Sequence, residues 1–173
     1  MQKVLYPATF DPISIGHVDL IKRAINIFGS VTVAVSKSEN KKTFFTAAER
    51  FNLAKKVLAK IKGVEVVSFD GLLVDFLHIL NIDIVIRGLR CSPDFNYEYK
   101  MFNVNKYMSK NFETIFLVAN QKYSFLSSTM IRQIAAIDPI RITDFVSPIV
   151  FNALIEKNLH NRNNKISVGT NEL

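Results

Sequence analysis

Short β-branched runs alternate along the chain with longer stretches in which apolar residues recur at helical spacing. The short runs predict strands at residues 3–6, 31–35, 64–69, 83–86 and 113–118. The periodic stretches predict helices at residues 16–28, 46–61, 72–80, 94–108, 127–136 and 148–158. Strands that alternate with helices in this way predict an α/β fold.

Several helix starts carry residues that satisfy free backbone amides. Thr46 precedes Glu49 by three residues, which is the spacing of a capping box. Ser147 followed by Pro148 is typical of an N-cap with proline at the first helical position. Asp94 is placed to cap the helix that runs to about residue 108. These signals support the predicted helix boundaries.

Right-handed crossovers between parallel strands predict a doubly wound, Rossmann-like five-stranded sheet with strand order 3-2-1-4-5 and C-terminal helices. That order reverses between the first and fourth strands, so ligands are expected beyond the carboxyl ends of these two strands. We expect one domain over residues 1–158. Residues 159–173 contain four asparagines and show no apolar period, so they are expected to form a polar, flexible tail.

Composition limits the class of protein. With 49% hydrophobic and 21% charged residues among 173, the chain is typical of a globular protein and too apolar to be disordered. Lys and Arg number 22 against 15 Asp and Glu, and the resulting charge of +7 favours anionic partners such as nucleotides, other phosphates or nucleic acid. Charge alone does not choose among them.

Cysteine use and hydropathy indicate the compartment. Cys91 is the only cysteine, which excludes an intrachain disulfide framework and zinc sites built from cysteine pairs. The first residues lack the apolar stretch of a signal peptide, and no run approaches the ~20 apolar residues of a membrane span. We therefore expect a cytoplasmic protein with no membrane partner.

Three elements that attract phosphate follow predicted strands. Thr9 and His17 surround the turn after the first strand, and residues 87–90 (Arg-Gly-Leu-Arg) follow the fourth. Residues 127–129 (Ser-Ser-Thr) open a helix after the fifth strand, where free amides also attract anions. Taken singly, these residues could be a backbone-bonded histidine, surface arginines and an N-cap. Their shared placement at strand ends favours a phosphate site.

The motifs of several other site classes are absent. The sequence has no G-x-x-x-x-G-K-[ST], no G-x-G-x-x-G and no G-x-S-x-G. Its three histidines, His17, His78 and His160, lack the spacing of metal ligands, so no protein metal site is expected. Lys41 and Lys42 are either a solvated pair or, from a loop at the same sheet edge, a phosphate contact.

Two segments identify a resemblance. Residues 6–19, which include Ser14-Ile15-Gly16-His17, resemble the T/HxGH signature of the nucleotidylyltransferase superfamily, and residues 127–132 resemble its ISSTxIR-like signature. Residues 86–90 with 94–98 are similar to the bacterial phosphopantetheine adenylyltransferase family over about residues 1–158. Ala8 stands where the family usually has Gly, and Ser14 where it has Thr or His.

The resemblance implies transfer of AMP from ATP to 4′-phosphopantetheine, which gives dephospho-coenzyme A and pyrophosphate. The implied catalytic residues are His17, Thr9, Lys41 and Arg90. The implied ATP-binding residues are Thr9, Phe10, His17, Gly88, Leu89, Arg90, Glu98, Tyr123, Ser124, Phe125, Leu126, Ser127, Ser128 and Thr129. Those for 4′-phosphopantetheine are Thr9, Lys41, Leu73 and Arg87. The family also implies Mg²⁺, supplied with ATP, and a homohexamer.

Two alternatives remain open. The first keeps nucleotidyl transfer but changes the acceptor to nicotinate mononucleotide or a sugar phosphate. The second is a basic RNA-binding module in which Phe and Tyr stack on bases. It fits less well, because most aromatic residues fall at predicted core positions and the cations do not form one stripe.

Overall fold

The computed structural model describes residues 3–37 and 42–169, with side chains described as far as residue 161. Five parallel strands form the sheet, namely β1 Val4–Ala8, β2 Val31–Ser36, β3 Val64–Phe69, β4 Ile84–Leu89 and β5 Glu113–Val118. They are hydrogen-bonded in the order β3-β2-β1-β4-β5, which confirms the predicted topology. The helices are α1 Ile15–Phe28, α2 Ala47–Leu58, α3 Leu73–Leu80, α4 Ser92–Met108, α5 Ser128–Ile137 and α6 Pro148–Gly169, with 3-10 turns η1 Gln121–Tyr123 and η2 Pro139–Ile142.

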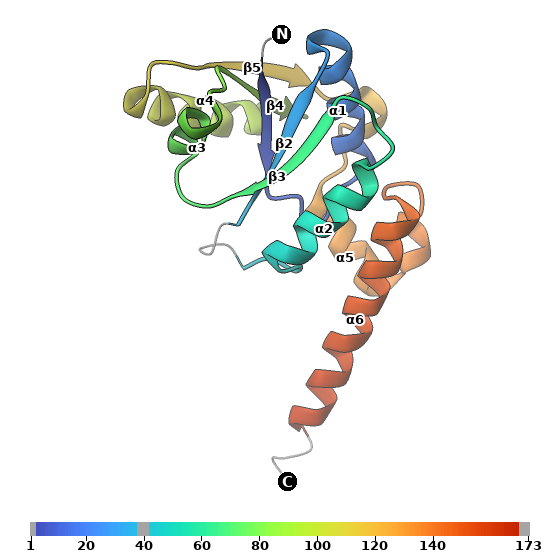
Figure 1. Cartoon of the computed structure of the whole chain (residues 1–173). Helices are drawn as coiled ribbons and strands as arrows, with labels where there is room; N and C mark the ends of the chain where they lie inside the picture. The colour runs from blue at the N-terminus through green and yellow to red at the C-terminus, as the bar shows by residue number, and fades with distance from the viewer. Residues whose placement is uncertain (1–2, 38–41, 170–173) are drawn as a thin grey trace.

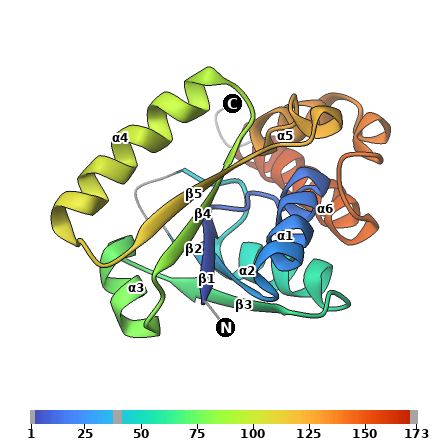
Figure 2. The same cartoon turned by 90° about the horizontal axis from the view of Figure 1, so that it is seen from above.

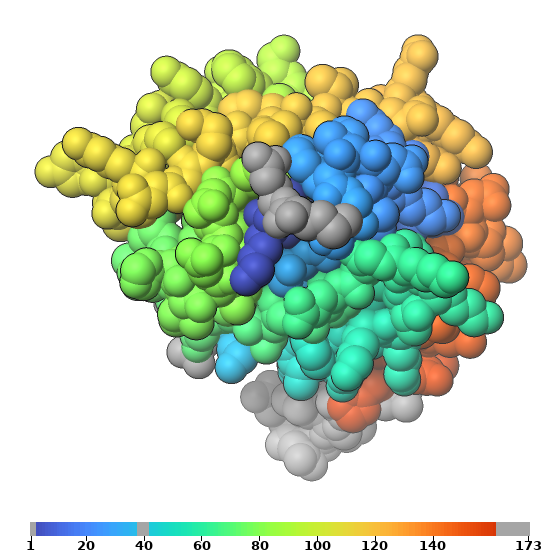
Figure 3. Space-filling view, turned by 45° about the horizontal axis from the view of Figure 1, so that its top comes forward, coloured from blue at the N-terminus to red at the C-terminus, as the bar shows by residue number. Residues whose placement is uncertain are grey.

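Helices cover both faces of the sheet. Helices α3 and α4 lie on one side, whereas α1, α2, α5 and α6 lie on the other (Figures 1 and 2). In the space-filling view the orange and red C-terminal part lies beside α1 and α2, away from the yellow-green α4–β5 part (Figure 3). No helix in the described ranges is both long and apolar enough to cross a membrane.

Two apolar cores follow from the alternation of side chains along each strand. Val4 and Val33 are buried with Ile21 on the side of α1, α2, α5 and α6. Leu5 and Val85 are buried with their neighbours on the side of α3. Adjacent residues of a strand point to opposite faces, so β1 contributes to both cores. This burial on both faces explains why the strands read as continuous apolar runs.

Strands β1 and β4 extend beyond their predicted ends. The proline at position 7 suggested an end at residue 6, yet β1 continues to Ala8 in register with β2. Likewise β4 continues to Leu89, paired with Val118 of β5. Residues 87–89 therefore lie within the strand and only Arg90 follows it.

Three helix boundaries also differ from the prediction. Helix α2 ends at Leu58 and not near residue 61. Helix α4 begins at Ser92, and Asp94 lies in its first turn, so Asp94 is not the N-cap. Helix α6 does not end near residue 158 but continues to Gly169. Between Pro148 and Gly169 the sequence has no Pro or Gly, and low apolar content by itself does not break a helix. The flexibility of residues 159–173 stays a prediction.

Candidate active site

Strands β1 and β4 separate at their carboxyl ends. They pair only through Val4 with Ile84 and Leu5 with Val85, although β4 stays paired with β5 as far as Leu89. Pro7 has no amide hydrogen to donate at this point. Its carbonyl instead accepts a hydrogen bond of 2.8 Å from Nη1 of Arg87. The separation opens a crevice where ligands bind in doubly wound sheets.

Two adjoining cavities occupy this crevice. The α1–α5 cavity, of about 430 Å³, lies among the carboxyl ends of β1 and β4 and the first turns of α1, α4 and α5. The α3–α4 cavity, of about 360 Å³, lies between the same strand ends and helices α3 and α4. Both are lined by Pro7, Ala8, Thr9, Arg87 and Glu98. A ligand in one cavity can therefore reach a ligand in the other.

Most residues predicted for the site line these cavities. The α1–α5 cavity includes Thr9, His17, Arg87, Gly88, Arg90, Glu98, Tyr123, Leu126, Ser127, Ser128 and Thr129. Leu73 lines the α3–α4 cavity. Four predicted ATP-binding residues line neither cavity, namely Phe10, Leu89, Ser124 and Phe125. Lys41 lies outside the described residues.

The turn after β1 has an unusual backbone conformation. Phe10 adopts a φ of 50°, which is rare for a bulky residue and is typical of functional sites. Its side chain is buried, and the centroid of its ring lies 5.6 Å from that of Tyr6 and 5.1 Å from that of His17. Phe10 therefore packs against the ring of His17, and it does not line the cavity itself.

Hydrogen bonds to Ser14 fix the orientation and tautomer of His17. The Ser14 amide donates to Nδ1 of His17 at 3.0 Å, so Nδ1 is the acceptor nitrogen and Nε2 carries the proton. Ser14 is also the N-cap of α1, and its hydroxyl accepts from the His17 amide at 3.4 Å. Burial, and secondarily the nearby charge of Arg90, lowers the pKa of His17 to about 4. The ring is therefore a neutral donor at neutral pH.

Arg90 is held at the entrance to α4. Its Nε and Nη2 donate to the two carboxylate oxygens of Asp94 at 2.8 and 2.9 Å, and Nη1 donates to the carbonyl of Leu126 at 2.9 Å. These bonds from Arg90 keep the pKa of Asp94 below its usual value. A guanidinium has five N–H donors, so two remain free for an anion. Asp94 was predicted to cap α4, but in the structure it orients the Arg90 side chain.

Arg87 lies where the two cavities meet. Its Nε is 3.2 Å from Oε2 of Glu98, and its Nη1 donates to Pro7, which leaves N–H groups of the fork unused. Next to it, Gly88 has a packing role, because a Cβ there would lie 2.5 Å from Cδ1 of Leu20 in α1. Glycine at this position lets α1 approach the sheet closely.

The three hydroxyls at the start of α5 have different partners. Ser127 is the N-cap, and its oxygen accepts from the Met130 amide at 3.1 Å. Ser128 donates its hydrogen to the carbonyl of Pro12 at 2.8 Å. Thr129 accepts from Nη2 of Arg132 at 3.3 Å. Ser127 and Thr129 therefore still have a hydrogen to donate to an anion, whereas that of Ser128 is already used.

The α3–α4 cavity is mostly apolar but contains one free amide. Phe69 and Leu73 line one side, and Tyr97 and Met101 line the other. Asn105 is only 7% exposed, and its side chain makes no hydrogen bond to any described residue. No buried side-chain nitrogen or oxygen of the described residues lacks a partner, so the Asn105 amide reaches the cavity and is available to a ligand with amide groups.

Several residues of the site were missed by the sequence analysis. Asp11 is buried, accepts from the amides of Phe44 and Phe45 at 2.8 and 2.9 Å, and pairs with Arg132 at 3.2 Å. Arg132 also donates to the backbone carbonyl of Asp11, which ties α5 to the turn after β1. Arg132 belongs to the second signature, but its partner is 121 residues away and no local pattern indicates it.

Metal ligands do not gather in the described residues, since no group of three or more His, Cys, Asp or Glu side chains is suitably placed. The carboxylates of Asp94 and Glu98 face arginines. These residues therefore do not form a protein cage for a divalent cation. Mg²⁺ usually binds through substrate phosphates and water, and such binding needs no cage.

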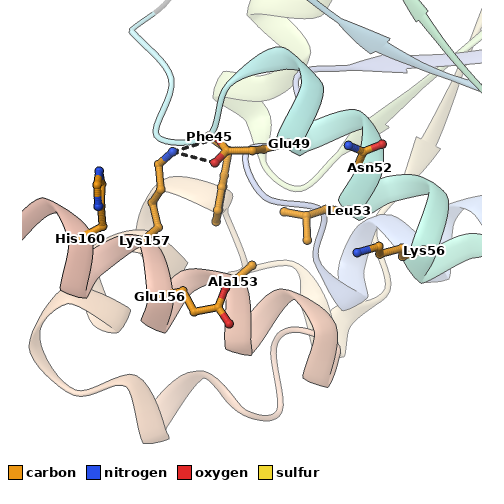
Figure 4. Close-up of a pocket in the computed structure, with 9 residues that line it drawn as sticks. All are labelled: Phe45, Glu49, Asn52, Leu53, Lys56, Ala153, Glu156, Lys157 and His160. Atoms are coloured by element: carbon orange, nitrogen blue, oxygen red, sulfur yellow. Dashed lines mark hydrogen bonds and ion pairs between the residues drawn. The ribbon is translucent and has the colours of Figure 1, made fainter.

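A separate groove of about 490 Å³ lies between α2 and α6 (Figure 4). Lys157 of α6 points to Glu49 of α2, and its Nζ donates to both carboxylate oxygens at 2.7 and 2.9 Å. Phe45 lies beside this pair, whereas Glu156 and His160 line the α6 side. None of the residues predicted for the site lines this groove.

Known proteins resemble this chain in both sequence and fold. Residues 5–134 match the cytidylyltransferase-like family. A phosphopantetheine adenylyltransferase from Paraburkholderia phytofirmans is 43% identical over 157 residues, which cover 91% of each chain. One from Nitrosomonas eutropha is 42% identical over 163 residues, which cover 94% of this chain and 99% of the relative.

Among solved structures, the nicotinic acid mononucleotide adenylyltransferase of Plasmodium falciparum, complexed with NaAD, has a TM-score of 0.70. The match covers 93% of this chain and 98% of that one, at 14% identity. A lipopolysaccharide core biosynthesis protein from Thermoplasma volcanium matches with a TM-score of 0.53 over 70% of this chain, at 16% identity. At these identities the likeness establishes the fold alone.

Proposed function

The chain belongs to the phosphopantetheine adenylyltransferases of the cytidylyltransferase-like family, and from this membership we propose how its two cavities divide the reaction. It is a nucleotidyltransferase that moves AMP from ATP to 4′-phosphopantetheine in coenzyme A synthesis. The observation that carries this assignment is identity of 42–44% to enzymes of that name over 88–94% of the chain. The geometry of the site supports it.

The α1–α5 cavity holds ATP in this proposal. The first turn of α5 offers free amides and the hydroxyls of Ser127 and Thr129 to the β- and γ-phosphates. Arg90 faces the same turn through its bond to Leu126 and offers two unused donors. Both groups are fixed before substrate arrives, so they need little reorganisation to bind the leaving pyrophosphate.

The α3–α4 cavity takes the pantetheine arm. Its walls of Phe69, Leu73 and Met101 suit the methylene and methyl groups of the arm, and Asn105 suits one of its amides. Arg87 at the junction holds the acceptor phosphate. Lys41 stays a prediction as a second cation for this phosphate.

His17 acts on the phosphorus that reacts. The neutral ring donates from Nε2 to an oxygen of the α-phosphate, where negative charge increases in the transition state. The N–H of a neutral imidazole is a very weak acid, so His17 keeps this proton while it donates the hydrogen bond. The ring therefore stabilises charge on the phosphate and does not act as a general acid. Its bonds to Ser14 hold it in the required tautomer.

The reaction needs no covalent enzyme intermediate. An oxygen of the acceptor phosphate attacks the α-phosphorus of ATP, the new P–O bond forms, and the bond to the β-phosphate oxygen breaks. Alignment of the two substrates at the junction accounts for much of the rate, because it turns a bimolecular step into one within a bound complex. Cations reduce the repulsion between the two polyanions.

Mg²⁺, a hexamer and a cytoplasmic location are further proposals. Mg²⁺ would enter with ATP, held by its phosphates and by water. Exposed apolar side chains along α4, among them Val104 and the 92% exposed Tyr107, support contact between copies of the chain. Analytical ultracentrifugation tests the hexamer.

Pyrophosphate release from ATP tests the function. We expect release only when 4′-phosphopantetheine is added, with dephospho-coenzyme A detected by mass spectrometry. Nicotinate mononucleotide and a sugar phosphate serve as control acceptors. Turnover with either control, and none with 4′-phosphopantetheine, would reject the assignment.

A further inference from the structure

Arg50 of α2 is a buried cation next to the site but outside both cavities. Its side chain is 1% exposed. It donates to four backbone carbonyls, those of Thr9 at 2.7 Å, Ser36 at 2.6 Å, Lys37 at 3.1 Å and Phe45 at 3.2 Å. Among the described residues its hydrogen bonds go to carbonyls and to no carboxylate, although the charge of Asp11 is close enough to favour the cation.

Two of these carbonyls belong to residues that line the cavity proposed for the acceptor. Thr9 and Ser36 line the α3–α4 cavity, whereas Arg50 does not. Lys37 follows β2 and Phe45 precedes α2, so Arg50 ties the end of β2 to the entrance of α2. Asp11 also fixes the entrance of α2, because it accepts from the Phe45 amide. One guanidinium thus joins the end of β1, the end of β2 and the entrance to α2.

The geometry requires arginine at this position. A planar guanidinium directs its N–H groups in several fixed directions, whereas a lysine ammonium is a single point on a flexible stem. The start of α2 is itself fixed by the capping box of Thr46 and Glu49 and by Lys157 (Figure 4). Arg50 therefore projects from a rigid base toward three separate segments.

We propose that Arg50 is a positioning residue for the acceptor substrate, acting through the backbone of Thr9, of the end of β2 and of the entrance of α2. This inference rests on the proposed assignment of the α3–α4 cavity to 4′-phosphopantetheine. Two of the four carbonyls belong to residues that line the α3–α4 cavity, Thr9 and Ser36, and of these only Thr9 also lines the α1–α5 cavity. Loss of Arg50 therefore impairs use of the acceptor more than use of ATP.

The test compares Arg50→Lys and Arg50→Gln with Leu58→Ala. Leu58 is buried two turns further along α2, so its truncation weakens packing of the helix without touching these carbonyls. We expect KM for 4′-phosphopantetheine to rise about tenfold in Arg50→Gln, and less in Arg50→Lys, with KM for ATP changed by less than about threefold. Leu58→Ala should leave both KM values unchanged. Equal rises for the two substrates, or an unchanged acceptor KM in a folded Arg50 variant, would overturn the proposal.

Hydrogen exchange gives a readout that does not depend on activity. In either Arg50 variant the amides of Phe44 and Phe45 should exchange faster, whereas in Leu58→Ala they should exchange as in the unaltered protein. Unchanged exchange at these amides would refute the positioning role even where activity is lost. If the unaltered protein forms no dephospho-coenzyme A, the proposed function fails, and the exchange result still decides whether Arg50 holds this backbone.

Discussion

The two cavities differ in how far their polar groups are already bonded. In the α1–α5 cavity, His17 is held by Ser14 and Arg90 by Asp94 before any ligand binds. In the α3–α4 cavity the walls are largely apolar, and the amide of Asn105 reaches the cavity and has no hydrogen-bond partner within the described ranges. Under the assignment proposed above, the side chains that act on developing charge are held in one orientation by other residues, whereas the acceptor is recognised by apolar walls and by the Asn105 amide.

The largest expected effect comes from His17, the centre of the prearranged side. His17→Ala should lower kcat by roughly 10² or more with modest change in ATP affinity, because its bond strengthens in the transition state. Steady-state kinetics and ATP titration measure the two quantities. His78→Ala is the matched control, since His78 lines neither cavity. Near-normal turnover in His17→Ala would remove the basis of the comparison.

A substitution of Asn105 tests the other cavity, the α3–α4 cavity proposed for the acceptor. Asn105→Leu keeps the branched shape of the side chain but removes the amide, so KM for 4′-phosphopantetheine should rise about tenfold while kcat changes little. The control is Asn103→Leu, because Asn103 is exposed on the same helix and bonds only to the carbonyl of Tyr99 in the described part of the chain. A fall in kcat at unchanged KM would place Asn105 on the catalytic side instead.

Substitutions at the start of α5 distinguish the loss of a helix cap from the loss of a phosphate ligand. Ser127→Ala should lower the free energy of unfolding by ~1 kcal/mol, because it removes an N-cap. Thr129→Val should leave the melting temperature of the free protein nearly unchanged but shrink the rise that Mg-ATP gives. Ser147→Ala, whose hydroxyl accepts from the Val150 amide far from the crevice, is the control that loses stability and keeps the full ATP effect. If Thr129→Val also keeps that full effect, the triphosphate site is misplaced.

The smallest effect on catalysis is expected from pH. Burial lowers the pKa of His17 to about 4, so the ring stays neutral from pH 6 to 8 and the kcat ratio of unaltered protein to His17→Ala should be constant there. The unfolded chain binds this proton at about 6.5, so stability contributed by neutral His17 is present above pH 6.5 and is lost as pH falls toward 4. Denaturant melts from pH 4 to 7 measure it. A kcat ratio that changes near pH 6.5 would contradict a prearranged neutral ring.

Sequence periodicity predicts the fold well because the strands are buried on both faces and the crossovers have one hand. Periodicity is a poorer guide to where each strand ends, and the cavities lie at these strand ends. Residues 87–89 read as a loop because Arg and Gly interrupt an apolar run, yet pairing with β5 keeps them in the strand. Tertiary pairing here overrides local composition.

Residues that line the cavities were predictable where a short motif carries them. His17 and residues 127–129 belong to such motifs, and they line one cavity as expected. Arg50 and Asn105 have no local signal, because a polar residue in a helix usually faces solvent. Arg50 is identified only by its contacts, which join segments separated by as many as 41 residues.

The proline at the end of β1 also affects how quickly substrates can enter. Where two strands are fully paired, a ligand that binds between them must wait for a fluctuation that breaks backbone hydrogen bonds. At Pro7 the chain never had an amide hydrogen to offer, so no such bond has to break. A substrate that enters beside Pro7 therefore does not have to wait for the sheet to open. A single imino acid thus removes one backbone bond from the crevice, and the fully paired strands β4 and β5 beside it stay closed.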